Sequence, residues 1–250
     1  MEKEKKKQVT VLIPTYNEKE NIEELIQEIL NLSLDFDLTV LVADDDSPDG
    51  TGEIVQKLSQ KDKRVQVLVR KKRRGRGAGG IDGFKAVLKL KPDYVVEMDG
   101  DFSHQPRFIP LLLDKAEKYD LVIGSRFIKG GKDLDRNFIR KMITLLVRKF
   151  IRHQFRIPIK DVSSGFRCFK KEVLERIDLD DLISVGPSVV LETLYKAYLM
   201  DFEIGEVPIV FVDRKKGKTK LNLLTLIETL IMALKFKKLY TSEKLSSERI

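Results

Sequence analysis

Short apolar runs alternate with stretches of helical periodicity along the first half of the chain, and this alternation limits the fold more than any other feature. The apolar runs cover residues 9–13, 38–43, 65–69 and 94–98. Their length and β-branched content are typical of buried strands. Between the first two runs, apolar residues recur with helical spacing over residues 22–30. Strands that alternate with helices predict an α/β domain with a mostly parallel sheet and helices on both faces.

The rest of the chain also divides into predicted elements. Its patterns predict strands over residues 120–123 and 206–212, and helices over residues 51–60, 84–90, 106–118, 141–155, 189–199 and 221–240. Residues 124–137 are rich in Gly and charge and predict a mobile loop, and residues 213–220 predict a basic loop. No repeat or linker divides the chain. We expect a charged tail over residues 1–7, one domain over 8–240 that ends in the amphipathic 221–240 helix, and a tail over 241–250, disordered from Ser242.

A basic excess predicts a phosphate-rich partner. The chain has 47 Lys and Arg against 39 Asp and Glu, a net charge of +8, which favours a nucleotide, a nucleic acid or an anionic membrane. The run over residues 70–80 can cradle a diphosphate, bind nucleic acid nonspecifically, or simply be solvated. It has neither the GxxxxGK[ST] pattern of a phosphate-binding loop nor the interleaved aromatic residues that stack on bases.

Few residues are available for nucleophilic catalysis. His104 and His153 are the only histidines; they lie far apart in the sequence, and neither pairs with a plausible Ser or Cys nucleophile, which argues against a Ser-His or Cys-His pair. Cys168 is the only cysteine, so a disulfide framework is excluded and a buried structural role is expected.

Acidic residues follow two of the predicted strands. Asp99 and Asp101 close the 94–98 strand, and Asp44, Asp45, Asp46 and Asp49 crowd the turn after the 38–43 strand. Ligands bind at the carboxyl ends of strands in open parallel sheets, and Mg²⁺ and Mn²⁺ prefer carboxylate oxygens. The residues alone leave two interpretations open for each cluster: a site for a cation or nucleoside, or an ordinary solvated turn.

The predicted basic helix carries a further candidate site. Arg140 and Thr144 are spaced i and i+4 and therefore share one helix face. The span 140–156 has six basic residues, no acidic residue and an apolar stripe. This pattern is typical of a helix on an anionic membrane surface, but it also fits an amphipathic helix packed on the core.

Six motifs occur together in one order: IPTYNE (13–18), DDDSPDGT (44–51), MDGDFSHQP (98–106), GSRF (124–127), DVSSGFRCF (161–169) and GEVPIVFVDRKKGKTKL (205–221). In this order they resemble glycosyltransferase family 2 and, within it, the dolichol-phosphate mannosyltransferases. The resemblance covers residues 8–222. It implies a GT-A fold, which is a Rossmann-like α/β domain, and the inverting transfer of mannose from GDP-mannose to dolichyl (polyprenyl) phosphate.

The resemblance also assigns residues to roles. It implies that the lipid phosphate binds Arg140 and Thr144, and that Asp99, Asp101 and Ser103 bind Mg²⁺ or Mn²⁺. Arg126 and Arg140 join Asp101 as the catalytic group, and Glu192 falls at an acidic position on the helix that faces the sugar. The implied donor-binding residues are Pro14, Tyr16, Glu18, Asp44, Asp45, Asp99, Gly100, Asp101, Ser103, Arg126, Arg214 and Lys220.

Many members of the resembled family carry transmembrane helices after this domain, and no segment of this sequence is apolar for long enough to span a bilayer. We therefore expect a peripheral protein on the cytoplasmic face of the membrane. It would reach the membrane through two amphipathic surface helices, 141–155 and 221–240, or through an anchoring partner. Three rival interpretations are a transferase that uses UDP-glucose or another donor, a noncatalytic basic protein that binds nucleic acid or membrane, and a nucleotidyltransferase. The sequence has no Gly-rich loop after the first strand, where nucleotidyltransferases commonly hold the triphosphate. The Asp44–Asp49 cluster argues against nucleic acid as the partner, because it would repel phosphates.

Overall fold

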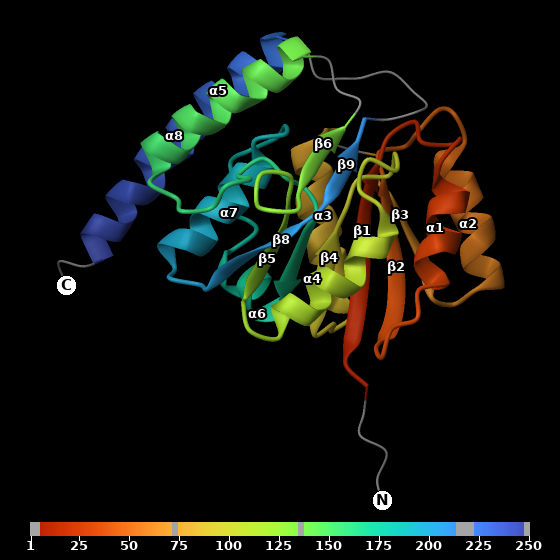
Figure 1. Cartoon of the computed structure of the whole chain (residues 1–250). Coiled ribbons are helices and arrows are strands. Elements are labelled where there is room, and N and C mark those ends of the chain that lie inside the picture. Colours follow the sequence, from red (N-terminus) through yellow and green to blue (C-terminus); the bar gives the residue numbers. More distant parts are fainter. Residues whose placement is uncertain (1–5, 72–74, 135–137, 214–222, 248–250) are drawn as a thin grey trace, which may run out of the picture.

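The structure, a computed structural model, describes residues 6–71, 75–134, 138–213 and 223–247 (Figure 1). A seven-stranded sheet with the order β3-β2-β1-β4-β7-β5-β8 forms its centre. The β1–β2, β2–β3, β1–β4 and β5–β8 pairs are parallel, and β7 is antiparallel to both of its neighbours. The strands are β1 (Gln8–Thr15), β2 (Asp37–Asp44), β3 (Val65–Val69), β4 (Tyr94–Glu97), β5 (Leu121–Ser125), β7 (Arg167–Lys170) and β8 (Ile204–Pro208).

Helices cover both faces of this sheet, as the alternation of strands and helices predicts. Along β1, Val9, Val11 and Ile13 face one core and Leu12 faces the other, because successive side chains of a strand point to opposite faces. The first core is closed by α1 (Ile22–Leu30), α2 (Thr51–Lys61), the short helix η1 (Pro106–Phe108) and α4 (Ile109–Ala116). The second is closed by α3 (Arg76–Lys89), α6 (Lys171–Arg176) and α7 (Val189–Leu199).

Part of the predicted mobile loop is a strand. β6 (Lys132–Leu134) pairs in parallel with β9 (Val210–Val212), so the prediction of an irregular loop over residues 124–137 is wrong for this segment. The predicted 206–212 strand is likewise two strands, because β8 ends at Pro208, which has no N–H to donate. After Pro208, the chain leaves β5 and joins β6 in the small sheet.

Helix α3 begins eight residues earlier than the predicted helix over residues 84–90, at Arg76. The glycines of this segment serve close packing and do not make it a flexible loop. A Cβ on Gly77 would lie 2.5 Å from the carbonyl carbon of Val185, and one on Gly83 would lie 2.7 Å from a methyl group of Leu12. The close approach of the Val185 backbone to Gly77 and of the Leu12 side chain to Gly83 therefore favours glycine at both positions.

Two long helices, α5 (Phe138–Phe155) and α8 (Leu223–Ser247), lie beside the α/β layers near the carboxyl ends of the strands (Figure 1). They meet where Phe155 packs against Phe236, with ring centroids 5.7 Å apart. Helix α8 continues through Ser247, so the prediction of a disordered tail is wrong for residues 242–247. None of the helices in the described ranges has the length and apolarity needed to cross a membrane.

Candidate active site

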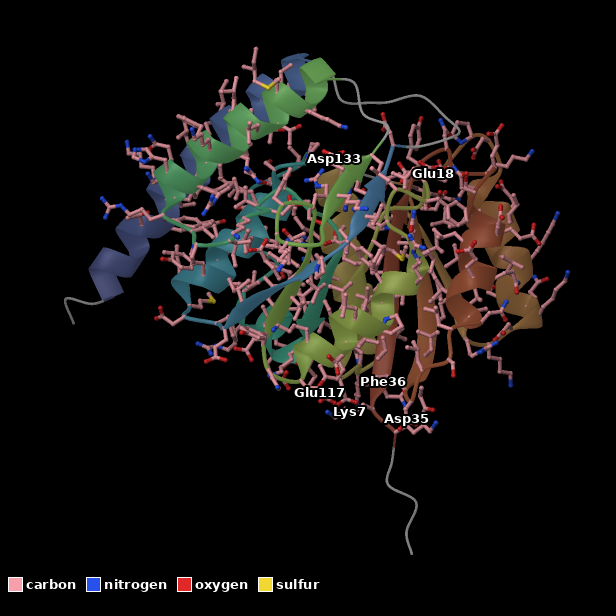
Figure 2. The ribbon with its side chains drawn as sticks, in the orientation of Figure 1. Lys7, Glu18, Asp35, Phe36, Glu117 and Asp133 are labelled. Atoms are coloured by element: carbon pink, nitrogen blue, oxygen red, sulfur yellow. The ribbon has the colours of Figure 1, made fainter. Side chains whose placement is uncertain are left out.

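A cavity of about 1030 Å³ opens at the carboxyl edge of the parallel strands. Glu18 and Asp133 lie at this edge, and Lys7 and Asp35 lie at the opposite one (Figure 2). In the sheet, β1 lies between β2 and β4, so the strand order reverses direction at β1. The segments that follow β1, β2 and β4 form part of the cavity wall. Ligands of open α/β sheets bind at such a point, so the fold itself marks the cavity as the candidate site.

The segment after β1 supplies one wall. Pro14, Tyr16 and Glu18 line the cavity, which is where the resemblance predicts the nucleoside of the donor. The Glu18 carboxylate accepts a hydrogen bond of 3.0 Å from Nδ2 of Asn21, and the Glu18 backbone N–H donates to Oγ1 of Thr51. These bonds fix the turn between β1 and α1 against the start of α2.

The acidic turn after β2 separates its carboxylates into two roles. Asp44 is 1% exposed and does not line the cavity; it accepts hydrogen bonds from Thr15 Oγ1 at 2.9 Å and from Ser47 Oγ at 2.6 Å. Asp45 does line the cavity, where it pairs with Arg70 and accepts the backbone N–H of Gly75 at 2.8 Å. The structure thus brings Asp45 to the predicted nucleoside site and uses Asp44 to hold the turn. Hydrogen-bond donors relieve the repulsion between these carboxylates.

Two arginines of the basic run, Arg70 and Arg76, pair with the protein's own acids. Arg70 is buried between Asp45 and Asp82. Arg76 begins α3 and donates from Nη1 to Glu97 at 3.0 Å and from Nη2 to Asp99 at 3.2 Å. Arg70 and Arg76 therefore match neither the predicted phosphate cradle nor the predicted solvated run, because both pair with carboxylates of the site.

Glu97, at the end of β4, connects Arg76 to a second buried arginine. Its Oε2 accepts hydrogen bonds from Nε of Arg167 at 3.2 Å and from Nη2 of Arg167 at 2.5 Å. Glu97 is 0% exposed and Arg167 is 1% exposed. Burial alone would raise the pKa of Glu97, but Arg167 and Arg76 hold it below its ordinary value. A charged Glu97 therefore orients Arg76 towards the cavity.

Asp99, Gly100 and Asp101 follow β4 directly and all three line the cavity. Asp101 is 6% exposed, and its Oδ1 accepts the Ser103 backbone N–H at 3.0 Å and the Ser103 hydroxyl at 2.6 Å. A Cβ on Gly100 would lie 3.1 Å from a methyl group of Thr15, so this turn packs tightly on β1. Ser103 acts here as a donor that orients Asp101.

His104 supports the turn formed by Asp99, Gly100 and Asp101. Its Nδ1 accepts the Asp99 backbone N–H at 3.0 Å, so this nitrogen carries no proton. The ring stacks on Phe166 with centroids 5.1 Å apart. Burial lowers the pKa of His104, which keeps the imidazole neutral although Asp99 and Asp101 are near. The second histidine, His153, lies on α5 and does not line the cavity.

The donor atoms of this wall fit a divalent cation. Over the described ranges, no three His, Cys, Asp or Glu side chains converge as a complete metal site. Asp99 and Asp101 both line the cavity and offer carboxylate oxygens, the ligands that Mg²⁺ prefers, so their predicted role in metal binding stays a prediction. The charge of the wall agrees with this reading. Its described residues include three arginines (Arg76, Arg126 and Arg148) and five carboxylates, a formal excess of two negative charges, the carboxylates being Glu18, Asp45, Asp99, Asp101 and Asp213.

Arg126 reaches the cavity from the end of β5. Its Nε and Nη2 form a bidentate pair with Asp161 at 2.8 and 2.7 Å, and Nη2 also donates to Ser163 Oγ. Burial opposes charge on both partners, yet each stabilises the other: the pKa of Arg126 is raised and that of Asp161 is lowered. The guanidinium is held in place by Asp161, with its Nη1 making no hydrogen bond to any described residue.

Helix α5 forms the wall that faces the strand ends. Thr144 and Arg148 line the cavity one helical turn apart. Arg140 lies one turn before Thr144 on α5, but its side chain is outside the described part of the structure. Arg214 and Lys220 also lie outside the described residues, so their predicted contacts with the donor stay predictions.

Glu192 does not line the cavity, although the resemblance places it on the helix that faces the sugar. It is 0% exposed, and its carboxylate accepts the backbone N–H groups of Ile183 and Ser184, each at 2.9 Å, and the hydroxyl of Tyr240. Ser188 and Leu191 of the same segment line the cavity instead. Glu192 thus joins α7 and α8 to the loop before α7.

The sequence alone did not single out three residues of the site. Arg76 was hidden in a basic run, and Asp161 begins a motif with no partner visible nearby in the sequence. Arg148 follows Thr144 at i+4, the same spacing that singled out Arg140 and Thr144, so extending that spacing by one turn finds it.

Comparison with known proteins shows which families and relatives this chain resembles. The family model for glycosyl transferase family 2 matches residues 10–178, a segment that includes the ends of β1, β2 and β4. The chain is similar to the undecaprenyl-phosphate mannosyltransferase of Micrococcus luteus, with 37% identity over 214 residues that cover 86% of this chain and 87% of that protein. It is also 39% identical over 226 residues to the dolichol-phosphate mannosyltransferase of Pyrococcus furiosus, covering 89% of this chain and 61% of that protein.

Solved structures support the fold. The chain resembles glucosyl-3-phosphoglycerate synthase from Mycobacterium tuberculosis in complex with Mn²⁺, UDP-glucose and phosphoglyceric acid, with a TM-score of 0.66. The identity is 20%, and the match covers 91% of this chain and 79% of that one. The same enzyme in complex with Mg²⁺ and UDP also gives a TM-score of 0.66. At this identity the likeness shows a shared GT-A-like architecture.

Proposed function

Because the chain belongs to glycosyl transferase family 2 and is therefore a glycosyltransferase, we propose that it transfers mannose from GDP-mannose to dolichyl or another polyprenyl phosphate. One observation carries the proposal: a single cavity is lined by strand-end carboxylates on one side and by α5, with apolar side chains, on the other. The two mannosyltransferases with 37% and 39% identity support mannose as the sugar and a polyprenyl phosphate as the acceptor.

The donor belongs at the strand ends in this proposal. Pro14, Tyr16, Glu18 and Asp45 surround the nucleoside, and Asp99 and Asp101 hold Mg²⁺ or Mn²⁺, ions that occur in the complexes of the structural neighbour. When bound, such a cation offsets the charge on the departing diphosphate. Ser103 keeps the Asp101 carboxylate in place, and Arg76 does the same for Asp99.

The acceptor attacks without a strong base. A phosphate monoester is already ionised near neutral pH, so its oxygen forms the new bond to the anomeric carbon directly. The bond from that carbon to the diphosphate oxygen breaks at the same time, and GDP leaves with the electron pair. An attack from the face opposite GDP inverts the anomeric centre. The neutral, buried His104 agrees with this scheme, because orientation and charge stabilisation do the catalysis.

Helices α5 and α8 bring this cavity to the lipid. Both expose large apolar side chains, with Leu146 on α5 61% exposed and Ile231 on α8 54% exposed. Exposed apolar side chains together with the basic residues of α5 are typical of helices at a membrane surface. The protein then acts as a peripheral enzyme that takes its acceptor from the bilayer.

Asp101→Asn tests the donor site. Asparagine keeps an oxygen that accepts from Ser103 but removes the negative charge, so we expect transfer to fall by about 100-fold or more. Asp114→Asn, the same change at an exposed position of α4, is the control. The assay follows labelled mannose from GDP-mannose into dolichyl phosphate with Mn²⁺, beside a parallel reaction with UDP-glucose.

Two outcomes would contradict the proposal. Near-normal turnover of Asp101→Asn at saturating Mn²⁺ would remove the metal role of this carboxylate. Exclusive use of UDP-glucose by the unsubstituted protein would overturn the mannosyl assignment and leave the glycosyltransferase fold untouched.

A further inference from the structure

Arg148 holds a position on α5 that neither the motifs nor the predicted acceptor residues account for. It lines the cavity one turn after Thr144, and its Cζ lies 4.0 Å from the centre of the Phe127 ring. Arg126 also lies against Phe127, with its Cζ 5.1 Å from the ring centre. Two guanidinium groups of the cavity wall therefore lie against one aromatic ring, that of Phe127.

The surroundings of Arg148 leave its charge uncompensated. No described carboxylate forms an ion pair with it, because the nearby Asp161 is held in a bidentate pair by Arg126. The other acid that acts on it, Glu206, accepts the backbone N–H groups of Lys160 and Asp161. Burial lowers the pKa of Arg148; the charge of Asp161 opposes this in part, and the charges of Arg152 and Arg126 add to it, so the pKa stays below its ordinary value. A bound anion would relieve that cost.

The lining around Arg148 indicates which anion belongs there. Ile143, Val147 and Ile151 of α5 and Leu226 of α8 line the same cavity, so this wall is apolar except for Arg148 and three threonines, Thr144, Thr225 and Thr229. Glu18, Asp45, Asp99 and Asp101 follow β1, β2 and β4, and Arg76 pairs with Asp99, so these charges lie on the strand-end side. A ligand with one anionic group on an apolar chain matches the α5 wall, whereas the diphosphate of a nucleotide matches the strand ends.

We propose that Arg148 is a binding residue for the acceptor, and that its guanidinium holds the lipid phosphate together with Nη1 of Arg126. This inference rests on the proposed function in one respect, namely that the acceptor is a phosphate on an apolar chain. The Phe127 ring orients both guanidinium groups, and the isoprenoid chain extends along the apolar side chains of α5 and α8. Arg148 thereby adds a third position to the acceptor site predicted at Arg140 and Thr144.

Farnesyl phosphate, a short and soluble polyprenyl phosphate, tests this assignment by calorimetry on the full chain. Arg148→Gln should raise its dissociation constant by about tenfold or more, because a hydrogen bond to a charged group is lost. Lys149→Gln makes the same charge change at the next, exposed residue of α5 and should stay within about twofold. Arg148→Lys keeps the charge but loses the planar stack on Phe127, and should recover part of the affinity. GDP binding should change by less than about twofold in all three variants.

Parallel turnover measurements with dolichyl phosphate separate this inference from the proposed function. The expected result is a raised KM for the lipid in Arg148→Gln with a smaller change in kcat. The inference is wrong if Arg148→Gln binds farnesyl phosphate as the unsubstituted protein does, if Lys149→Gln loses as much affinity, or if the unsubstituted protein binds none. If binding depends on Arg148 but no mannose is transferred, the inference stands and the mannosyl function fails.

Discussion

Replacing Glu97 with glutamine tests whether the buried charge network behind the cavity is needed for stability. Glu97 is 0% exposed and lies between Arg167 and Arg76. Glutamine has nearly the same shape, but it has no charge and turns an amide group towards one of the two guanidinium groups. Arg167 keeps its bonds from Nη1 to the Val190 carbonyl at 2.8 Å and to Thr193 Oγ1 at 2.7 Å. The substitution therefore removes the charge partner and leaves the packing.

The expected loss is large because both charges are buried. Breaking a buried ion pair by removing one partner costs about 3–5 kcal/mol, since the remaining charge stays desolvated. The bonds that Arg167 keeps place Glu97→Gln near the lower limit, about 3 kcal/mol. For a chain of this length, that loss corresponds to a fall in Tm of about 6–12 °C.

Urea unfolding followed by circular dichroism measures this difference. Asp180→Asn is a matched control, because Asp180 pairs with Lys85 at the surface, where its side chain is 83% exposed. A surface pair contributes little, so the control should stay within about 0.5 kcal/mol of the unsubstituted protein. A Glu97→Gln variant within about 1 kcal/mol of the control would refute the claim that the network stabilises the fold.

The remaining predictions concern other buried carboxylates. Glu192→Gln should lower the free energy of unfolding by about 1–3 kcal/mol, because an amide cannot accept all three hydrogen bonds that Glu192 accepts. A lower urea midpoint with an unchanged KM for the nucleotide sugar would show that this role is structural and not catalytic. The pKa values of Asp161 and Glu97 are lowered in the folded state, so their stabilisation is present above about pH 4 and disappears as the pH falls through the folded-state values. Urea midpoints between pH 6 and pH 3 should therefore fall less steeply in Asp161→Asn, and an unchanged slope would contradict the assignment.

Elements with a strong local pattern were predictable from the sequence. The strand over residues 65–69 and the helix over residues 189–199 have the predicted bounds in the structure, because β-branched or helical periodicity fills each segment from end to end. Asp45, Asp99 and Asp101 were likewise predicted at the cavity, since residues that follow parallel strands must meet at one edge of the sheet.

Other features depend on partners that lie far away in the sequence. Strand β7 includes Arg167, a charged residue that is buried only because Glu97 lies opposite it on β4. The sequence did not predict the start of α3, because glycine disfavours isolated helices. The glycine at position 77 is explained by the close approach of the Val185 backbone, which lies far away in the sequence. The resemblance places Glu192 on the helix that faces the sugar, but its hydrogen bond with Tyr240 depends on the position of α8, which the local sequence does not show.

Charge is distributed unevenly in the cavity, so the strand-end side and the α5 side suit different anions. On the strand-end side, Asp45 pairs with Arg70 and Asp99 with Arg76, yet carboxylates outnumber arginines among the described residues of the wall, which is why the proposed function places a cation beside the nucleotide diphosphate. On the α5 side, the protein itself supplies the positive charge through Arg148. A phosphate acceptor can therefore bind beside a donor of the same charge, because each anion meets its own source of positive charge.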